Sequence, residues 1–561
     1  MARIIFLLSA LLLFPCVTQS QPQAQPPAPP AADLSQMPPD CLVAGEFTNP
    51  DQVCGIVERL MGSIEQKPEP GMLRRVFGKM MGNPGMDGVA LDRPMRFYYM
   101  SPKLHGQPWV YQVAVADAAA LTKALGPARP APQGHPLGAL EFSIEKPADE
   151  NAQPPAAAPA LPPIAVSAYL LIQGDTATIY FSPSACDSLL RWEKAQPPPE
   201  WRVPGQLRAR FAIQHLLSAY DAEFTQEVQA MRDRMREALE RLGKRPETEE
   251  GIRSAQGQLD MAVTLVKQVE NLDIGIDLSE TAAAIRAYAL PLPRSTLANL
   301  VRTHPRASLE LFKSCPAGVD VVFAQNISMV GAVSGMLLSR LGLPGMGEAV
   351  SANVATQTLV GLLLPQGPNG TLSGLMMRTN QTAESAGQFW SRLAQAGEST
   401  AFGLKPVEPP GGETVSLAEV TVNEAKLGPG GTRALRRVLG PRPMAAQELR
   451  SGRSVLAIGA EPLALLAQVR GLDADPAGSL GANMTFLRTK AALSILPNVL
   501  LYASPEAVAR WLALAEIPAP APRPGALGFA AECTLMPDGC IQAGLLLPLG
   551  QILQARTQNA P

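Results

Sequence analysis

A strand, a tight polar turn, an apolar strand and a helix follow one another twice in this chain. This order appears at Ala168–Leu190 and again at Ala445–Leu466. A second pair of segments, Ile274–Leu300 and Gly528–Gln554, shares the order of hairpin, apolar strand and helix. Because a hairpin joins antiparallel neighbours, the repeated order predicts an α+β fold of mostly antiparallel sheet packed with helices.

The first copy shows how local residues set this pattern. Gly174-Asp175 is a preferred turn dipeptide and predicts a hairpin over Ser167–Phe181. Ser182 then has the residue type of a helix N-cap, and Pro183 suits the first helical position. We therefore expect a strand to lead through a short turn into a helix at this point.

The duplication also sets the expected domain boundaries. A chain of 561 residues is long enough for two or more domains. We expect two tandem α+β modules, 41–305 and 306–561. The two copies share few identical residues, so chance similarity is the alternative interpretation.

The strongest helical pattern lies in the first module. Apolar residues step by three or four through 224–242 and again through 252–269, and Gly243–Pro246 separates the two runs. This spacing predicts a long antiparallel helical hairpin over 221–272, with charges on its outer faces. We expect it to pack on the sheet of its own module; a partner-binding coiled coil is the alternative.

The second module carries an apolar stretch in the corresponding place. Residues 329–364 are rich in Gly, Ala, Ser and Met, and Gly342–Gly345 divides them into two predicted short helices. They are either two buried helices or an exposed Met-rich surface that binds a lipid or a protein partner.

The N-terminus predicts export. An apolar run, Ile4–Phe14, follows a positive charge, and Thr18 and Ser20 suit the −3 and −1 positions of a cleavage site. Residues 1–20 are therefore expected to be a cleavable signal peptide, because a membrane span needs about 20 apolar residues. An uncleaved anchor and a lipoprotein modified at Cys16 are the alternatives.

The mature chain is expected to be a soluble protein of the periplasm or the extracellular space. Residues 21–40 form a Pro/Ala-rich leader that we expect to be disordered, and no later segment has the pattern of a transmembrane helix. Loss of Arg3 with the signal changes the formal net charge from −2 to −3. This near-neutral charge argues against nucleic acid as a partner.

Six cysteines remain after removal of the signal, and an even number in an oxidising compartment favours disulfides. Cys41 and Cys54 are the favoured pair, because a bridge between them would fasten the segment that follows the leader. A Cys533–Cys540 bridge is disfavoured, since Met536–Gly539 predicts a type I turn with a Gly bulge that pairs Met536 with Cys540. Free buried thiols are the alternative for all six. No CxxC pair is present to suggest a zinc or redox site.

The sequence offers no motif for catalysis, cofactor binding or metal binding. No HExxH is present, and the four histidines are expected to be surface or core residues; they are His105, His135, His215 and His304. The nearest serine-hydrolase patterns, Gly397–Ala401 and Gly331–Gly335, lack a second glycine or misplace the serine. No phosphate-binding glycine loop occurs. We predict no catalytic residue, no cofactor and no metal ligand.

The overall plan resembles a class of uncharacterised exported bacterial proteins. The resemblance rests on the signal, the Pro/Ala leader and duplicated hairpin–helix modules with phrases such as Ile274-Gly275-Ile276-Asp277-Leu278. It implies an envelope location and no particular activity.

Three functional hypotheses follow from these patterns. The first is a non-enzymatic envelope protein that binds a lipidic ligand or a protein partner, with 329–364 as the candidate surface. The second is a hydrolase whose Ser, His and carboxylate, or paired carboxylates, are brought together only by the fold. The third is a scaffold that assembles through the helical hairpin at 221–272.

Overall fold

The structure of the chain, a computed structural model, divides into two compact units. Among the described residues, the first unit contains the chain up to Glu280 together with Ile285–Pro293, and the second contains Thr281–Ala284 and the chain from Arg294 onward. The structure describes residues 37–62, 71–145, 165–195, 200–240, 256–257, 259–260, 262–303, 310–325, 358–363, 374–380, 386–388, 390–391, 402–409, 414–425, 432–433, 435–436, 439–450, 453–493, 497–514, 521–536 and 538–550.

The strands of the first unit pair with one another in the order β10-β9-β8-β1-β2-β3-β7-β6-β5-β4. Apart from β3–β7 and β1–β8, neighbours in this order are consecutive strands along the chain, and short turns join β6 to β7 and β9 to β10. The strands are β1 (Cys41–Phe47), β2 (Met95–Met100), β3 (Trp109–Ala114), β4 (Arg129–Pro130), β5 (Leu140–Glu145), β6 (Ala165–Gln173), β7 (Thr176–Tyr180), β8 (Leu207–Ala212), β9 (Val269–Leu278) and β10 (Ala283–Pro291).

The strands of the second unit pair in the order β20-β19-β18-β11-β12-β13-β17-β16-β15-β14. This is the order of the first unit with ten added to each strand number. They are β11 (Val321–Gln325), β12 (Thr358–Leu363), β13 (Gly374–Thr379), β14 (Phe402–Val407), β15 (Val415–Val422), β16 (Met444–Arg450), β17 (Arg453–Gly459), β18 (Val499–Ala503), β19 (Phe529–Leu535) and β20 (Ile541–Leu547). An internal duplication would produce this repeated order.

The pairing of the strands corrects one part of the expected fold class. We expected two tandem modules, each with its own sheet, but the 20 strands found among the described residues belong to one antiparallel sheet. The sequence pattern identified strand pairs joined by hairpins. It held no signal for pairing between strands that are distant along the chain, because such pairs have no turn between them.

Helices connect the strands in both units. Those of the first unit are α2 (Pro50–Gly62), α3 (Met72–Met80), α4 (Pro102–His105), α5 (Ala118–Ala124), α6 (Pro183–Ala195), α7 (Ile213–Ala219) and α8 (Asp221–Glu240). Those of the second are α10 (Thr296–Thr303), α15 (Pro462–Ala474), α16 (Met484–Leu493), α17 (Pro505–Leu514) and the short 3₁₀ helices η1 (Glu310–Ser314), η3 (Pro476–Gly478) and η4 (Leu480–Ala482).

The long helical hairpin expected over 221–272 also needs correction. Helix α8 forms its first arm, and the described residues between 256 and 266 are helical. The second arm does not reach 272, because β9 begins at Val269 and pairs with β8, with Leu272 opposite Phe211. Residues 241–255 lie outside the described residues. The apolar spacing of three or four residues therefore continues into strand β9, whose first apolar positions happen to fit a helical period.

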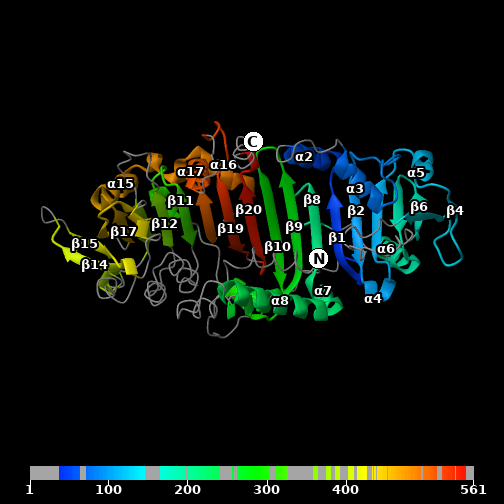
Figure 1. Ribbon diagram of the computed structural model, residues 1–561, viewed down its shortest axis with the longest axis horizontal. Coiled ribbons are helices and arrows are strands. Elements are labelled where there is room, and N and C mark those ends of the chain that lie inside the picture. Colours follow the sequence, from blue (N-terminus) through cyan, green and yellow to red (C-terminus); the bar gives the residue numbers. More distant parts are fainter. Residues whose placement is uncertain are drawn as a thin grey trace, which may run out of the picture. The chain divides into compact units, whose positions relative to one another are not determined.

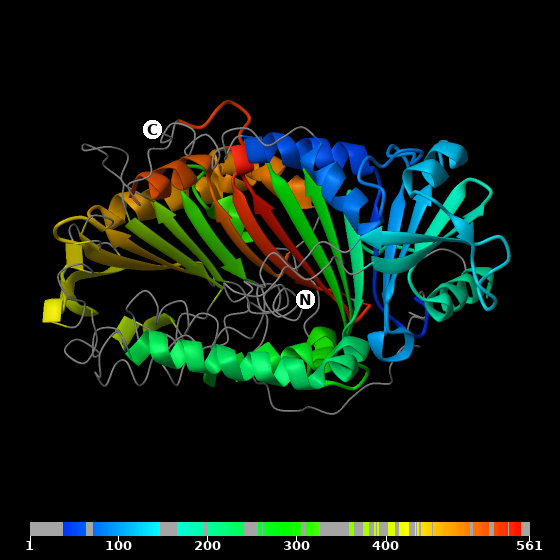
Figure 2. The same ribbon diagram turned by 45° about the vertical axis from the view of Figure 1, so that its right-hand side comes forward.

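Helices lie on both faces of the first unit's strands (Figures 1 and 2). On one face, Val53 of α2 and Leu121 of α5 pack with Met95 and Tyr111. On the other, the apolar face of α6 packs on Tyr98 and Val110. Neighbouring residues of a strand point to opposite faces. Tyr98 and Val110 therefore point to the face covered by α6, and the residues next to them on β2 and β3 point to the face covered by α2 and α5.

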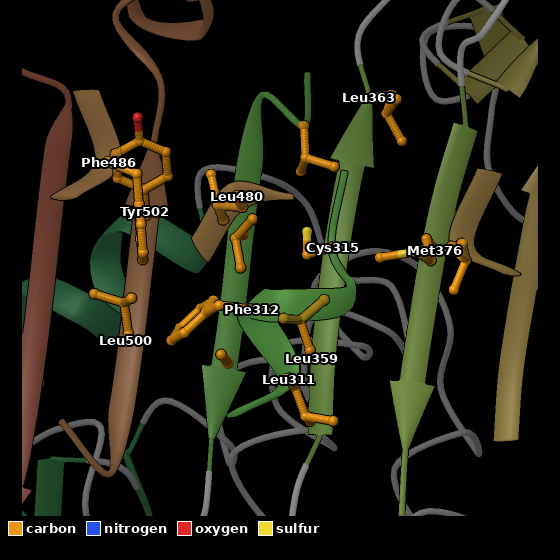
Figure 3. Packing of buried hydrophobic residues seen from close by; sticks show 14 of the residues in the cluster. Leu311, Phe312, Cys315, Leu359, Leu363, Met376, Leu480, Phe486, Leu500 and Tyr502 are labelled. Atoms are coloured by element: carbon orange, nitrogen blue, oxygen red, sulfur yellow. The ribbon is translucent and has the colours of Figure 1, made fainter. Parts of the chain in front are cut away.

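The core of the second unit gathers around η1, η4 and α16. Figure 3 shows Phe312, Leu480 and Phe486 together with Leu500 and Tyr502. The ring centroids of Phe312 and Phe486 are 5.1 Å apart, and those of Phe486 and Tyr502 are 5.0 Å apart with nearly perpendicular planes. The tilted contact of the first pair and the edge-to-face contact of the second add to the stabilisation from buried apolar area.

Two expected turns are confirmed. Gly174 connects β6 to β7 with a positive φ of 62°, which favours glycine. At the other, the Met536 N–H donates to the Cys540 carbonyl at 2.7 Å, and Gly539 has φ 88°. Met536 therefore pairs with Cys540, and Cys533 lies opposite Ala543.

The stretch expected to form two helices over 329–364 is wrong at its C-terminal end. Thr358–Leu363 form strand β12, which pairs with β11 and β13. The remainder of that stretch, the signal at 1–20 and most of the leader lie outside the described residues. Within the part of the chain that the structure describes, no helix is both long and apolar enough to cross a membrane.

A buried ion pair joins β8 to β9 in the first unit. Arg210 donates from Nε and Nη2 to the two carboxylate oxygens of Asp273 at 2.7 and 2.6 Å. The two side chains are only 2% and 4% exposed. Arg210 also donates to the Glu200 carbonyl at 3.0 Å, and its guanidinium lies 5.7 Å from the Trp201 ring centroid. Each side chain therefore depends on the other to remain charged away from water.

We expect Asp273→Asn to lower the free energy of unfolding by about 3–5 kcal/mol, because it leaves the Arg210 charge buried without its counter-ion. Denaturant titration measures this change. The matched control is Asp175→Asn, which breaks the exposed pair with Arg93 and is expected to have a much smaller effect, because water screens the charges of an exposed pair. Equal effects of the two substitutions would contradict this assignment.

Candidate active site

Ser184 lies at the start of a helix that directly follows a strand. Strand β7 ends at Tyr180, and α6 begins at Pro183, whose fixed φ suits the first helical position. The Cys186 N–H donates to the Ser182 carbonyl at 3.2 Å, which is the first hydrogen bond of the helical series. Ser184 is exposed, whereas Ala185 and Cys186 beside it are buried. The strand–turn–helix geometry therefore presents the Ser184 hydroxyl at the surface.

His105 ends the short helix α4 and faces Ser184. Its Nδ1 lies 2.9 Å from Ser184 Oγ. The imidazole side chain is only 6% exposed, so it is largely shielded from water at the edge of the unit. In Figure 1, α4 lies at the lower ends of β1 and β2, next to the start of β1.

Asp40 lies immediately before β1 and completes the group. One carboxylate oxygen, Oδ2, is hydrogen-bonded to His105 Nε2, and the other, Oδ1, accepts a hydrogen bond from Ser188 Oγ at 2.7 Å. The Asp40 backbone carbonyl accepts from the Ser101 N–H at 2.8 Å. Asp40 is therefore held through its backbone beside β2 and through its side chain between α4 and α6.

The hydrogen bonds determine which imidazole nitrogen carries the proton. An ionised carboxylate only accepts, so His105 Nε2 must donate to Asp40. In the neutral imidazole this leaves Nδ1 as the acceptor, and Ser184 Oγ donates to it. Ser182 Oγ lies 3.0 Å from Ser184 Oγ and supplies a second polar contact. The chain of groups runs from a hydroxyl to a base to a carboxylate.

Backbone N–H groups of α6 lie beside the Ser184 hydroxyl. The N–H groups in the first turn of an α-helix have no acceptor inside the helix, and Ser184 and Ala185 occupy that turn. The helix dipole adds partial positive charge at the same end. Negative charge that develops near Ser184 Oγ would therefore be stabilised by this end of α6.

The second unit makes the same strand–turn–helix without these groups. Strand β17 ends at Gly459, and Pro462 begins α15, as Pro183 begins α6. Leu463 follows that proline where Ser184 follows Pro183. The fold at this position consequently does not require a serine.

A row of charged side chains crosses the same face of the first unit. Glu46 on β1 lies opposite Arg208 on β8 and Arg96 on β2. Its two oxygens accept from Arg208 Nη2 at 2.7 Å and from Arg96 Nε at 2.9 Å. Next along the row, Gln112 donates to Glu193 Oε2 of α6 at 3.1 Å. Burial raises the pKa of Glu193, opposed by the Gln112 hydrogen bond and the charge of Arg96.

Tyr98 and Trp192 lie next to this row in the apolar cluster under α6. Among the described residues, neither the Tyr98 hydroxyl nor Trp192 Nε1 has a hydrogen-bond partner. Burial, and then the charge of Glu193, raise the pKa of the Tyr98 phenol well above its usual value. This phenol therefore stays protonated and takes no part in proton transfer.

The structure leaves the expected disulfide pair as two free thiols. Cys41 lies in the cluster under α6, whereas Cys54 lines a small apolar pocket with Phe47 and Phe77. Burial raises the pKa of both thiols, and it raises that of Cys186 to about 12. Such thiols are weak nucleophiles, since the thiolate is the reactive form.

Three histidines lie away from the Ser184 group or outside the described residues. His135 packs against Tyr169, with ring centroids 3.9 Å apart and planes tilted by 38°, and its Nδ1 lies 3.2 Å from the Tyr180 hydroxyl. His215 lies on α7, and His304 is outside the described residues. Within the described chain, no group of His, Cys, Asp and Glu is arranged to hold a metal ion.

Sequence reasoning did not identify Ser184, His105 or Asp40 as site residues. The nearest glycine-flanked serine patterns, Gly397–Ala401 and Gly331–Gly335, both lie outside the described residues. The available signal was the strand, turn and helix at Ser182-Pro183, which marks an exposed serine at a helix start. His105 and Asp40 are 65 residues apart along the chain, and only the pairing of β1 with β2 brings them together.

Comparison of the chain with models of known protein families, with curated proteins and with solved structures found no match.

We expect Glu193→Gln to raise stability more at about pH 8 than at about pH 4. A raised pKa means that the folded state prefers the protonated Glu193, so its contribution is present at low pH and is lost as the pH rises through the folded-state pKa. Glutamine stays neutral and can still accept from Gln112. Thermal unfolding of variant and wild type at both pH values tests this, and a difference that shrinks as the pH rises would contradict it.

We also expect Cys41 and Cys54 to be recovered as separate, unbridged peptides from a non-reducing digest. They pack in different clusters, and burial keeps both thiols protonated. Mass spectrometry after blocking free thiols in denaturant measures the pairing. A Cys41–Cys54 bridged peptide would restore the disulfide hypothesis.

Proposed function

We propose that this protein is a serine hydrolase that cleaves acyl esters, with Ser184 as nucleophile, His105 as general base and Asp40 as the carboxylate that orients the base. The observation that carries the proposal is the continuous hydrogen-bonded chain from Ser184 Oγ through the two His105 nitrogens to Asp40. A nucleophile bonded to a base that is in turn oriented by a third group is the general signature of nucleophilic catalysis.

The proposed reaction has two steps. Ser184 Oγ attacks the ester carbonyl carbon while its proton moves to His105 Nδ1, and the imidazolium then protonates the leaving alkoxide as the C–O bond breaks. Water attacks the acyl-serine next, gives a proton to Nδ1, and the carboxylic acid leaves as Ser184 recovers that proton. Throughout, the Asp40 charge stabilises the imidazolium that forms.

The first turn of α6 supports both steps. The Ser184 and Ala185 N–H groups belong to the first turn of α6, have no acceptor inside the helix and are available to donate to an oxyanion formed beside the nucleophile. Preorganised donors of this kind contribute a large share of the catalysis of acyl transfer.

Comparison of the two units also supports the proposal. The turn before α15 has Leu463 after its proline and builds the same strand, turn and helix. Ser184 is therefore an addition to the fold rather than a requirement of it. An exposed hydroxyl hydrogen-bonded to a shielded imidazole restricts both side chains, and a leucine at the corresponding position of the second unit makes no such bond.

Export belongs to the same proposal. The signal pattern at 1–20 supports activity outside the cytoplasm. The hypothesis of a lipid- or partner-binding surface at 329–364 concerns residues that mostly lie outside the described ones, and no contact of the described chain favours it.

We expect Ser184→Ala to lower kcat for p-nitrophenyl acetate at least about a hundredfold, because the nucleophile is lost, and His105→Ala to have a similar effect. The matched control is Ser295→Ala, since Ser295 likewise lies at a helix start, where its hydroxyl accepts the Ala298 N–H, and it has no histidine partner among its described contacts. A fluorophosphonate probe should label Ser184 in the wild type only. Full activity of Ser184→Ala, or labelling of a different serine, would overturn the proposal.

A further inference from the structure

Ser188 lies one helical turn after Ser184 on α6. Residues four apart on a helix lie on the same face, with Cβ atoms about 6 Å apart. The Ser184 hydroxyl bonds to His105, and the Ser188 hydroxyl bonds to Asp40. Since His105 and Asp40 are also bonded to each other, the four side chains form a closed ring with one turn of α6 as its fixed side.

We infer that Ser188 is a positioning residue that sets the orientation of Asp40, and through it the tautomer of His105. This inference rests on the proposed function for its kinetic consequence, whereas its geometric consequence can be measured without any activity.

The two oxygens of Asp40 have separate partners. Ser188 donates to Oδ1 at 2.7 Å, and Oδ2 is the oxygen bonded to His105 Nε2. With Oδ1 held, the carboxylate cannot turn about its Cβ–Cγ bond without losing a hydrogen bond to a charged group. Such bonds are stronger than those between neutral groups. Oδ2 therefore stays directed at Nε2.

A fixed Oδ2 determines where the His105 proton resides. The proton is kept on Nε2, where the carboxylate accepts it, so Nδ1 keeps its lone pair toward Ser184. Without Ser188, Asp40 remains attached through its backbone, because Ser101 N–H still donates to its carbonyl. The carboxylate alone gains freedom, and the population of the productive tautomer falls.

The alternative role for Ser188 is simple packing. Ser188 is partly buried beside the buried residue Leu189, so removal of its hydroxyl could disturb α6. Ser188→Thr separates the two roles, because threonine keeps the hydroxyl while it changes the volume. Ser188→Ala removes the hydroxyl and leaves the helix with a residue of high helical propensity.

Kinetics with p-nitrophenyl acetate compare Ser188→Ala, Ser188→Thr and Ser184→Ala in the full mature chain. For Ser188→Ala we expect kcat to fall roughly ten- to a hundredfold with KM nearly unchanged, in the range found on losing a hydrogen bond to a charged group. Ser188→Thr should restore most of kcat. Wild-type kcat in Ser188→Ala, or an equal loss in both variants, would overturn the inference.

Nuclear magnetic resonance of protein labelled with ¹⁵N in histidine tests the geometry directly. The His105 signals, assigned with His105→Gln, should show a proton on Nε2 and a bare Nδ1 in the wild type, and a mixture of tautomers in Ser188→Ala. Unchanged His105 signals in Ser188→Ala would overturn the inference even if Ser184 is the nucleophile. Full activity of Ser184→Ala would overturn the proposed function alone, since the tautomer comparison would still stand.

Discussion

The antiparallel register of β1 with its two neighbours is the constraint on which the first unit depends. All seven residues of β1 are buried, and the strand is paired on both sides, with β2 and with β8. Cys41 lies opposite Met100, so the residue before β1 meets the residue after β2. Asp40 and Ser101 are those residues, and α4 then carries His105 back to the Asp40 carboxylate. A shift of one residue would turn the strand's side chains to the other face and would separate the two groups.

The parts of the fold that the sequence could predict are those that depend on neighbours along the chain. The hairpin at Gly174 and the turn at Met536–Gly539 followed from residue types that each turn demands. The helix after Ser182-Pro183 followed from its N-cap and first-turn signals. The single sheet and the end of the helical region before Val269 depend on pairing with distant strands. Apolar spacing alone could not distinguish the last turn of a helix from the first residues of β9.

The candidate site was hidden for a related reason. Its three groups come from three separate segments of the chain, and although the Ser182-Pro183 signal marks an exposed serine, no nearby residue marks a catalytic role. Ser184 lacks the flanking glycines of a nucleophile motif, and a single histidine at the end of a four-residue helix resembles a surface residue. Only the contacts made by β1, α4 and α6 bring the three side chains within hydrogen-bond distance. Searches for local motifs therefore excluded chemistry that the fold assembles.

The two units differ in chemistry along one row of strand positions. The rows are matched at the third residue of β7 and the third residue of β17, and each row then follows directly opposite residues across the strands. The row of the first unit is Arg208, Glu46, Arg96, Gln112 and Thr178. The row of the second unit is Leu500, Ala324, Leu359, Arg378 and Val455. Most of the second row belongs to an apolar core. The same strand order thus accommodates either chemistry, and it does not by itself require the polar groups of the first unit.

The free thiols have a consequence for how such a chain would mature. An exported chain is unfolded when it meets an oxidising compartment, and every cysteine is then open to attack. Once folded, Cys41, Cys186 and Cys315 are buried, and burial raises the pKa of each, so almost no thiolate remains to exchange with a disulfide. Folding itself would then end the period of oxidative vulnerability. These cysteines would stay reduced only if the core folds faster than an oxidant reacts with the unfolded chain.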